Sequence, residues 1–594
     1  MAPEESTRNG RGLDLRVLGR LLLYLRPYAP WVGMTLLFIT IGSLARQAGP
    51  LLTKFAVDDH FRPGIKDGFG TLILIYMGLL VLQFGLGYFE SWATNMVGQW
   101  AMRDVRQLLF NHLQRLPLRF FDRTPIGRLM ARNTSDVDAL NELFTDGLVA
   151  LVSDIVTVTT ILGLIFYMDV HMGLLTTICL PLSFLATVWL QRVTYGAYQE
   201  ARTRFASFAA SLQEAISGME VVQLFGSEDR RSRGFADSND RYLTARLLAS
   251  KYHSAYFPSM ELWGGLLLAV TLWYGTGQIT QQQMEWGVLV AMLQYVPRFF
   301  MPLRDIAERY ATVQTAMASA ERIFELVDTE PEAGGTHMAA GQLQGHVEFR
   351  HVWFTYGEDH GDDAEWILRD VSFTVAPGQS LAIVGATGAG KSTVVSLLCR
   401  FYEVQRGAVL IDGIDVKDWD ARDLRRRIGL VHQDVFLFAG TIGDNISLGD
   451  PQMSRERIET VARDTNADRF VLRLPQGFEQ PVGERGVSLS SGQRQLLSFA
   501  RVLAADPEIL VLDEATANID TETEMWIQDA VSRLMQKRTS LVIAHRLSTV
   551  RTADTILVLH HGQVREMGPH DELLAQQGLY YRLHQLQFNE GDRP

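Results

Sequence analysis

Residues 385–392 read GATGAGKS, and this stretch decides the fold of the second half of the chain. It follows the apolar run Leu381–Val384 and precedes Ser392–Phe401, where apolar residues recur at helical spacing. A strand, a glycine-rich turn ending in Lys-Ser and a helix together form the phosphate-binding loop of nucleotide-binding α/β folds. We therefore predict a strand–loop–helix unit at this point.

The residue types of this loop suit the chemistry of phosphate binding. Its glycines let backbone N–H groups turn toward phosphate oxygens, and the start of the following helix adds its positive dipole end. The glycines expected to bind nucleotide are Gly385, Gly388 and Gly390. Lys391 is expected to reach the β- and γ-phosphates, the Ser392 hydroxyl is expected to bind Mg²⁺, and Thr393 is a further predicted nucleotide contact.

A second motif places two acids at the end of a strand. The run Ile509–Leu512 is apolar, and Asp513 and Glu514 follow it directly. Asp513 can hold the hydration shell of Mg²⁺, and Glu514 can take a proton from an attacking water molecule. Two adjacent acids after a strand can also form a surface turn. Their position downstream of a phosphate-binding loop favours the catalytic interpretation.

The pattern around both motifs is that of an α/β domain. Short β-branched runs alternate with helical segments, which is typical of nucleotide-binding folds. The predicted strands are His346–Phe354, Ser380–Val384, Ala408–Ile411, Ile509–Leu512, Thr539–Ile543 and Thr555–Leu559. We assign residues 346–585 to this domain and residues 586–594 to a tail. Residues 326–345, rich in Gly, Glu and Ala, are predicted to be a linker.

The first 325 residues carry long apolar runs instead. A membrane-spanning helix needs about 20 predominantly apolar residues. Six such runs predict a helical transmembrane domain over residues 31–325, with spans at about 31–53, 70–97, 143–167, 172–193, 256–279 and 286–307. The whole chain has a mean hydropathy of +0.03, which fits a mixture of a membrane domain and a soluble domain.

The distribution of arginine predicts the orientation of the spans. The long stretches between spans two and three and between spans four and five are rich in Arg, whereas the turn Gln278–Glu285 contains no Lys or Arg. Because positive residues stay on the cytoplasmic side, the long stretches are expected there, as helices that continue the spans. Residues 1–30 are then cytoplasmic, with Leu13–Tyr28 as an amphipathic helix on the inner membrane surface.

Composition excludes several other classes of protein. The net charge of -12 disfavours nucleic-acid binding, which needs a basic face. Two cysteines, Cys179 and Cys399, cannot form a disulfide framework or a metal cluster.

Further motifs resemble those of one family. Leu489-Ser-Ser-Gly-Gln493 closely resembles the signature motif of ABC ATPases, and Val482–Gly486 resembles the segment that exporters place before it. Four further positions resemble family motifs and follow one another in the family's order. Tyr356 resembles the aromatic residue that stacks on adenine, and Gln433 resembles the Q-loop glutamine. Residues 517–520 resemble the D-loop, and His545 resembles the switch histidine. With six spans in front, nearly the whole chain resembles an ABC exporter half-transporter, which implies a six-span helical membrane domain followed by an α/β P-loop ATPase domain.

The resemblance implies a catalytic arrangement. Two ATPase domains would face each other, with each ATP between the loop of one and the signature of the other. ATP and Mg²⁺ are the implied cofactors, and Ser392, Gln433 and Asp513 are the implied metal ligands. Ser490, Gly492, Gln493 and Asp520 would contact nucleotide, while Glu514, His545 and Gln433 would support hydrolysis. Phe120–Gly127 resembles the first coupling segment, which transmits closure to the membrane helices, and Ala215–Glu228 is expected to hold the second.

One position departs from the family pattern. Ser491 stands where the signature usually has its first glycine, while the loop, Asp513, Glu514 and His545 are intact. This combination resembles the active subunit of heterodimeric bacterial multidrug exporters, and it implies a different partner chain with a degenerate ATPase site. A homodimer, in which Ser491 is a harmless substitution, stays open.

The membrane half leaves the cargo open. Charged residues inside the spans, candidates for function, are Arg46, Glu90, Asp154, Glu261 and Arg298. Large side chains that either line a cavity or simply pack are Trp263, Trp273, Tyr295, Phe299, Phe300 and Met301. The resemblance implies export of hydrophobic or amphipathic small molecules across a bacterial inner or plasma membrane. Lipids or peptides as cargo, and an ATP-gated channel or an importer as function, are the alternatives.

Overall fold

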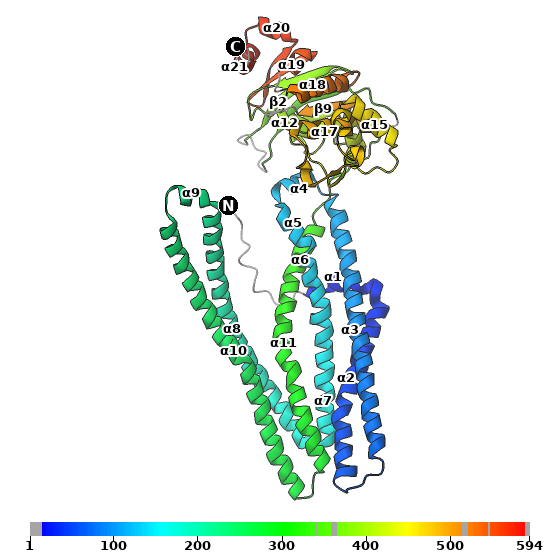
Figure 1. Cartoon of the computed structure of the whole chain (residues 1–594), viewed down its shortest axis with the longest axis vertical. Coiled ribbons are helices and arrows are strands. Elements are labelled where there is room, and N and C mark those ends of the chain that lie inside the picture. Colours follow the sequence, from blue (N-terminus) through cyan, green and yellow to red (C-terminus); the bar gives the residue numbers. More distant parts are fainter. Residues whose placement is uncertain (1–14, 340, 358–364, 514–520, 545–546, 589–594) are drawn as a thin grey trace. The chain divides into compact units, whose positions relative to one another are not determined.

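A computed structural model describes residues 15–339, 341–357, 365–513, 521–544 and 547–588, which form two compact units (Figure 1). The membrane unit comprises the described residues up to Arg115 and Thr124–Thr329. The ATPase unit comprises the described residues from Glu330 onward together with one short segment from the first half, Leu116–Arg123.

The membrane unit is helical throughout. Its helices are α1 (Leu15–Leu25), α2 (Ala29–Phe55), α3 (Phe69–Leu113), α5 (Ile126–Asn133), α6 (Ser135–Glu142), α7 (Ala150–Met168), α8 (Val170–Ser217), α9 (Met219–Leu224), α10 (Glu228–Thr280) and α11 (Trp286–Val327). Each predicted span falls within one of these helices or, for the third span, within α7 and the π-helical turn Leu143–Val149 before it.

Four helical stretches among the described residues are long and apolar enough to cross a membrane: Arg16–Phe61, Phe69–Leu113, Ile126–Met168 and Glu228–Thr280. They contain the first, second, third and fifth predicted spans. Helix α8 contributes the shorter apolar stretch Val170–Cys179, and α11 carries Arg298 and two prolines. Crossing by α8 and α11 therefore stays a prediction.

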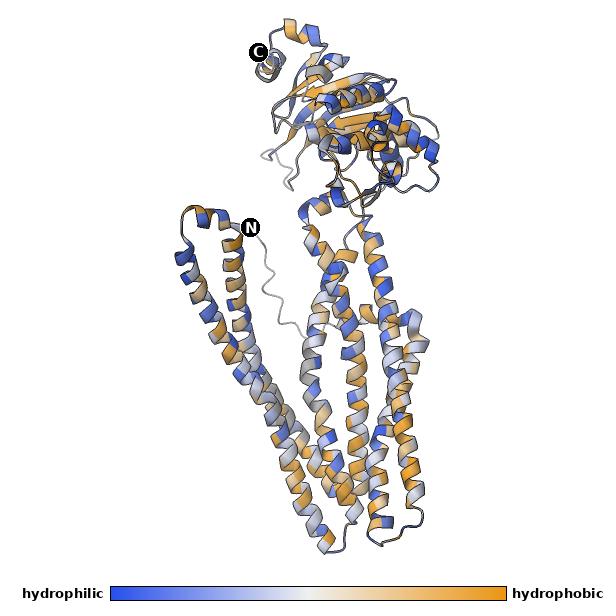
Figure 2. Cartoon of the chain, viewed as in Figure 1, coloured by the Kyte–Doolittle hydropathy of each residue, from blue (hydrophilic) through white to orange (hydrophobic). Residues whose placement is uncertain are grey.

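The predicted continuation of the spans as helices is confirmed. Helix α8 has 48 residues and α10 has 53, more than twice the length that a bilayer requires. Figure 2 shows hydrophilic residues becoming frequent along both helices toward α9. The apolar parts can therefore lie in lipid while the remainder extends into water.

Most of the charged groups in the spans have partners within the membrane unit. Arg46 lies 3.6 Å from Glu90, and Asp154 lies 2.8 Å from Arg309. Arg298 donates a 2.8 Å hydrogen bond to the carbonyl oxygen of Arg46. Because an unpaired charge is costly in lipid, these contacts give the charges a structural role. Glu261 is exposed on α10.

The six large side chains named as candidates divide by burial, and Trp263 is partly buried against the core described next. Tyr295, Phe299 and Phe300 are buried in a core formed by α7, α10 and α11, and the Tyr295 hydroxyl donates to the carbonyl oxygen of Gln47 at 2.6 Å. They are packing residues of this chain. Trp273 and Met301 are exposed on the unit.

Helix α1 has the predicted amphipathic form. Leu21 is buried, while Leu22 and Leu23 are exposed. The Arg20 guanidinium makes two 2.8 Å hydrogen bonds to the Asp328 carboxylate. These contacts fix α1 to the end of α11, where the membrane unit ends.

The ATPase unit has two large sheets and a third sheet of two strands, in which β7 pairs with β8. The first has the strand order β12-β11-β3-β10-β9-β6 and is parallel except for β12, and the second is antiparallel with the order β2-β1-β4-β5. The strands are β1 (Val347–Phe354), β2 (Leu368–Val375), β3 (Ser380–Val384), β4 (Arg406–Ile411), β5 (Ile414–Asp415), β6 (Ile428–Val431), β7 (Gly440–Thr441), β8 (Pro481–Val482), β9 (Ile509–Asp513), β10 (Thr539–Ile543), β11 (Thr555–His560) and β12 (Gln563–Gly568). All six predicted strands are confirmed, with ends that differ by at most two residues.

The helices of this unit pack on the sheets or on one another. They are α12 (Lys391–Leu398), α13 (Ala421–Arg427), α14 (Ile442–Ser447), α15 (Arg455–Asp464), α16 (Asp468–Val471), α17 (Ser491–Ala505), α18 (Thr521–Met535), α19 (Leu547–Thr552), α20 (His570–Ala575) and α21 (Leu579–Phe588), and α4 (Leu118–Arg123) also belongs to this unit. Successive residues of β10 enter different cores: Leu541 packs on one face and Val542 on the other. A strand buried on both faces reads as a continuous apolar run.

The predicted linker packs on the ATPase unit. The Glu332 carboxylate accepts two hydrogen bonds from the Arg425 guanidinium. The backbone N–H of His337 donates to the Asp418 carbonyl oxygen at 2.9 Å, and the His337 ring stands edge-on to Trp419. A segment with few apolar residues is thus held by polar contacts, which its composition does not reveal.

Candidate functional site

The glycine-rich loop connects β3 to α12 as predicted. Gly388 and Gly390 have φ angles of +80° and +100°, a region that glycine occupies without strain. A Cβ atom on Gly385 would lie 2.2 Å from the carbonyl oxygen of Leu559, so only glycine fits there. The buried strand and the backbone constraint together set the curve of the loop.

Lys391 lies inside this curve. Its side-chain ammonium donates to the carbonyl oxygens of Gly385 and Ala386 at 2.8 and 3.0 Å, and the residue is only 7% exposed. Burial lowers the pKa of Lys391, while the negative charge of Asp513 opposes that shift. A buried cation whose hydrogen bonds go to neutral carbonyl groups is well suited to exchange them for phosphate oxygens.

Strand register brings Asp513 to the same edge. Asp513 is the last residue of β9 and pairs with Ile543 of β10, which in turn pairs with Ile383 of β3. In a parallel sheet the carboxyl ends of neighbouring strands share an edge, and ligands bind there. The electrostatic effect of Asp513 on Lys391 agrees with this placement.

Gln433 reaches the same edge from the next strand. Strand β6 ends at Val431, which pairs with Leu512 of β9, and Gln433 follows two residues later with an exposed side chain. Ser392, also exposed, begins α12 on the loop side. A hydroxyl, an amide oxygen and a carboxylate are hard oxygen donors of the kind that Mg²⁺ takes while it keeps several waters. The chemistry of this donor set fits the predicted metal.

Tyr356 stands beside the loop helix. Its hydroxyl lies 3.2 Å from the Thr393 hydroxyl of α12. The rings of Phe354 and Tyr402 pack edge-on against it, with centroids 4.8 and 4.9 Å away. Tyr356 is 41% exposed, so part of its surface is open to a base.

The signature residues form the start of another helix. Ser490 caps α17: its hydroxyl oxygen accepts from the N–H of Gln493 at 3.2 Å, and the Gln493 side chain accepts from the N–H of Ser490 at 3.0 Å. Gly492 is buried. Ser491 is the first helical residue, with an exposed side chain, and its φ is not positive. The serine in place of glycine therefore causes no backbone strain within this chain.

Three predicted site residues cannot be placed. Glu514, Asp520 and His545 lie outside the described residues, as do positions 517–519 of the D-loop-like segment. Within the described part of the site, the structure brings together the loop, Asp513 and Gln433. Among the described residues, no hydrogen bond joins Ser490 or Gln493 to residues 385–393.

One functional candidate was missed by sequence reasoning. Tyr402 lies behind Tyr356, and its hydroxyl donates to the carboxylate of Asp122 in α4. The neighbouring Arg123 donates to the carbonyl oxygen of Tyr356 at 3.3 Å. Burial and the contact with Asp122 raise the pKa of Tyr402. A single tyrosine after a helix gives no sequence signal of this contact, because its partner lies 280 residues away.

Comparison with known proteins identifies both halves of the chain. Residues 32–303 match the family described as ABC transporter transmembrane region, and residues 368–517 match the family described as ABC transporter. The chain is 37% identical over 560 residues to a probable multidrug resistance ABC transporter ATP-binding/permease protein of Bacillus subtilis, which covers 93% of this chain and 82% of the relative. It is 34% identical over 576 residues to an ATP-dependent lipid A-core flippase of Syntrophus aciditrophicus, with coverage of 97% and 95%.

A solved structure agrees with these sequence matches. A bacterial Atm1-family ABC exporter with ATP bound matches the fold with a TM-score of 0.77 and 30% sequence identity. The match covers 94% of this chain and 98% of that one.

We expect Gly390→Ala to weaken ATP binding by about tenfold, because a Cβ at this strained φ would also lie 2.6 Å from Leu368 and distort the loop. The measurement is the dissociation constant of a fluorescent ATP analogue. Gly378→Ala is the matched control: its φ is also positive, +72°, but a Cβ there meets open space away from the loop. Unchanged binding by Gly390→Ala would contradict the assigned role of the loop.

Proposed function

The chain belongs to the family of ABC transporters that join a transmembrane region to an ATP-binding domain, and from this premise we propose that it exports hydrophobic or amphipathic small molecules. It is a multi-pass membrane protein that couples ATP hydrolysis to transport, and exporters of this family work as dimers. The proposed location is a bacterial inner or plasma membrane, with the ATPase unit and the N-terminus in the cytoplasm.

The observation that carries the proposal is the position of α4. This helix comes from the first half of the chain, yet it packs within the ATPase unit against Tyr402 and Tyr356. Tyr356 in turn touches Thr393 of the loop helix. A nucleotide that orders Tyr356 therefore acts, through two contacts, on the segment that joins α3 to the following membrane helices. This link favours an ATP-driven transporter over an ATPase with an independent membrane anchor.

The proposed reaction is ATP hydrolysis with residues in distinct roles. Tyr356 packs against adenine, and the loop glycines with Lys391 and Thr393 hold the phosphates. Glu514 takes a proton from water as the water oxygen bonds to the γ-phosphorus and the bond to the bridging oxygen of ADP breaks. His545, Gln433 and Asp520 are assigned places around the γ-phosphate. Mg²⁺, held by Ser392, Gln433 and Asp513, would neutralise charge on the phosphates.

The signature is proposed to complete the ATP site of a second chain. The Ser490 hydroxyl oxygen accepts the Gln493 N–H, which leaves its own O–H free to donate to a phosphate of the partner's nucleotide. The exposed Ser491 side chain adds bulk to the same surface without changing the fold of this chain. We therefore propose a different partner, whose degenerate ATPase site tolerates this serine.

Two features support amphipathic cargo. The named relatives include a probable multidrug resistance transporter and a lipid A-core flippase, and the second name refers to a lipid. In this chain the charged groups Arg46, Glu90 and Asp154 are paired with protein groups, so they are not needed to bind a strongly charged core of a substrate.

We expect Glu514→Gln to retain ATP binding but to lower turnover to about 1% of wild type, because the amide cannot accept a proton from water. Phosphate release and nucleotide binding are measured on the same proteoliposomes, which contain the chain with its copurified partner, along with ATP-dependent accumulation of a fluorescent hydrophobic dye. Glu572→Gln, on the exposed surface of α20, is the control. Turnover at half the wild-type rate or more would show that Glu514 is not the main base. Steady ion conductance unaffected by Glu514→Gln would replace the exporter with a channel.

We expect Tyr402→Phe to uncouple transport from hydrolysis. The ring still packs on Tyr356, but the hydrogen bond to Asp122, of a charge-assisted type worth about 1.5–3 kcal/mol when well shielded, is lost. Dye transported per ATP hydrolysed should fall several-fold while ATPase turnover stays within about twofold of wild type. Tyr581→Phe, which removes a hydroxyl bonded to Gln585, serves as control. An unchanged ratio of transport to hydrolysis would remove α4 from the coupling route.

We expect the chain purified alone in lipid to be monomeric or to form a dimer that does not hydrolyse ATP, because its partner is missing. Native mass and ATPase activity are determined on one sample. In such a homodimer, Ser491→Gly should raise the rate of ATP hydrolysis, since it restores the usual signature. A wild-type dimer that hydrolyses ATP and is inactivated by Glu514→Gln would establish a homodimer and a harmless Ser491.

A further inference from the structure

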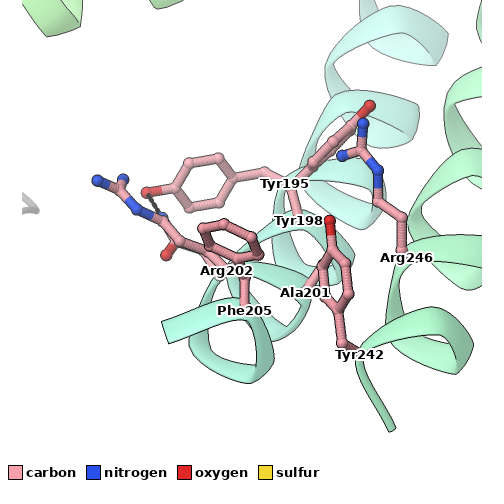
Figure 3. A pocket seen from close by; sticks show the side chains of 8 residues that line it. Tyr195, Tyr198, Ala201, Arg202, Phe205, Tyr242 and Arg246 are labelled. Atoms are coloured by element: carbon pink, nitrogen blue, oxygen red, sulfur yellow. Dashed lines mark hydrogen bonds between the residues drawn. The ribbon is translucent and has the colours of Figure 1, made fainter. Parts of the chain in front are cut away.

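A pocket of about 490 Å³ lies between α8 and α10, in the parts of these helices that extend beyond the predicted spans. Figure 3 shows aromatic rings from the two facing helices around it, with an arginine from each helix beside the rings. The lining residues used below are Tyr195, Tyr198, Arg202 and Phe205 from α8, and Tyr242 and Arg246 from α10.

The aromatic side chains form an apolar wall in an otherwise hydrophilic segment. The rings of Phe205 and Tyr242 lie 5.4 Å apart between their centroids. Tyr195 and Phe205 are nevertheless 55% and 50% exposed. Exposed rings gathered around a concave site are typical of surfaces that bind an apolar group.

The charges around this wall are all positive. Arg202 and Arg246 have no acidic partner among the residues that the structure describes, and no acidic side chain lines the pocket. The Arg246 guanidinium lies 5.4 Å from the centre of the Tyr198 ring, a cation–π contact that leaves its N–H groups available.

Neighbouring arginines on the same helices behave differently. Arg204 is paired with Glu200 at 2.7 Å, and Arg241 is paired with Asp237 at 2.7 Å. Each of these pairs lies along a single helix, at spacing i,i+4. Charge compensation is thus present next to the pocket and missing at it, which indicates that the pocket cations are available to an external anion.

The position of the pocket along α8 suits a ligand that comes from the inner membrane surface. The fourth predicted span ends near residue 193, so Tyr195 and Phe205 lie about 3 and 18 Å beyond it at 1.5 Å per residue. Tyrosine is favoured at the level of the lipid headgroups. A molecule with an apolar body can therefore reach the rings from the bilayer or from water.

We propose that this pocket binds an amphipathic organic anion, with its apolar body on the aromatic rings and its carboxylate or phosphate at the guanidinium group of Arg202 or Arg246. The inference rests on the proposed export function and narrows its cargo to anionic amphiphiles. A neutral ligand would leave both guanidinium groups without a partner, and a cation would be repelled by them.

The test uses the full chain with its copurified partner in phosphatidylcholine nanodiscs, without ATP. The probe is the fluorescent fatty acid 11-(dansylamino)undecanoate, and its methyl ester has nearly the same body without the charge. We expect the acid to bind at least about tenfold more tightly than the ester, since a carboxylate–guanidinium contact is a charge-assisted hydrogen bond.

Three double variants locate this preference. Arg202→Gln/Arg246→Gln should abolish the preference for the acid while ester binding persists, and Arg202→Lys/Arg246→Lys should keep most of it because the charge remains. Arg204→Gln/Arg241→Gln, which removes the paired arginines outside the pocket, should leave the preference unchanged. Ester binding reports whether each variant is folded.

Phosphatidylglycerol in the nanodisc distinguishes the sources of the anion. Competition with the probe in wild type, lost in Arg202→Gln/Arg246→Gln, identifies a lipid phosphate as occupant, and absence of competition identifies an anion from the aqueous side. Equal binding of acid and ester by wild type, or a preference that survives in Arg202→Gln/Arg246→Gln, would overturn the proposal. Binding is measured without ATP, so it does not depend on export. If the preference for the acid were intact but ATP-driven transport were absent, the proposed export function would be refuted while the proposed binding site would stand.

Discussion

The parallel register of β3, β10 and β9 is the constraint on which the ATP site depends. It places the carboxyl ends of the strands at one edge, where β3 continues into the loop and β9 ends at Asp513. The separation of Lys391 and Asp513 is therefore set by backbone hydrogen bonds between buried strands, and neither side chain has to search for its position. The same register carries Gln433 to this edge, since β6 pairs with β9.

This constraint explains how much of the site could be predicted. Strands buried on both faces, such as β10, read as apolar runs, and the loop glycines read as a motif, so the order of the elements was accessible from sequence. The polar edge strand β12 and the four-residue β6 gave weaker patterns and were not predicted. Tyr402 was missed because its role comes from Asp122, far away in sequence. The packing of the segment after Glu330 was missed because polar contacts hold it, among them the ion pair between Glu332 and Arg425.

In the membrane unit, the solvent around each segment, lipid or water, decides which structural features can be predicted from the sequence. Helix positions were predictable because lipid requires long apolar runs with internally satisfied backbone groups. The role of the charged residues could not be predicted, because it depends on partners in other helices. Arg46 is paired with Glu90, and Asp154 is paired with Arg309. These residues, the first functional candidates by sequence, are paired inside the unit. Arg202 and Arg246, which have no acidic partner in the part of the chain that the structure describes, lie beyond the predicted spans, where a charged residue gives no sequence signal of function.

Exporting a molecule requires that nucleotide and cargo each change the energy of the same helices. On the nucleotide side the contact is through α4, which follows α3 and is held at Tyr402 and Tyr356. On the cargo side the proposed pocket joins α8 to α10 across their hydrophilic extensions, on either side of α9. A ligand that packs on the α8 rings and on Tyr242 of α10 would favour the arrangement of the two helices in which those rings lie close together. Cargo and ATP would then act on different helices that belong to one membrane unit, which is the least structure that coupling requires.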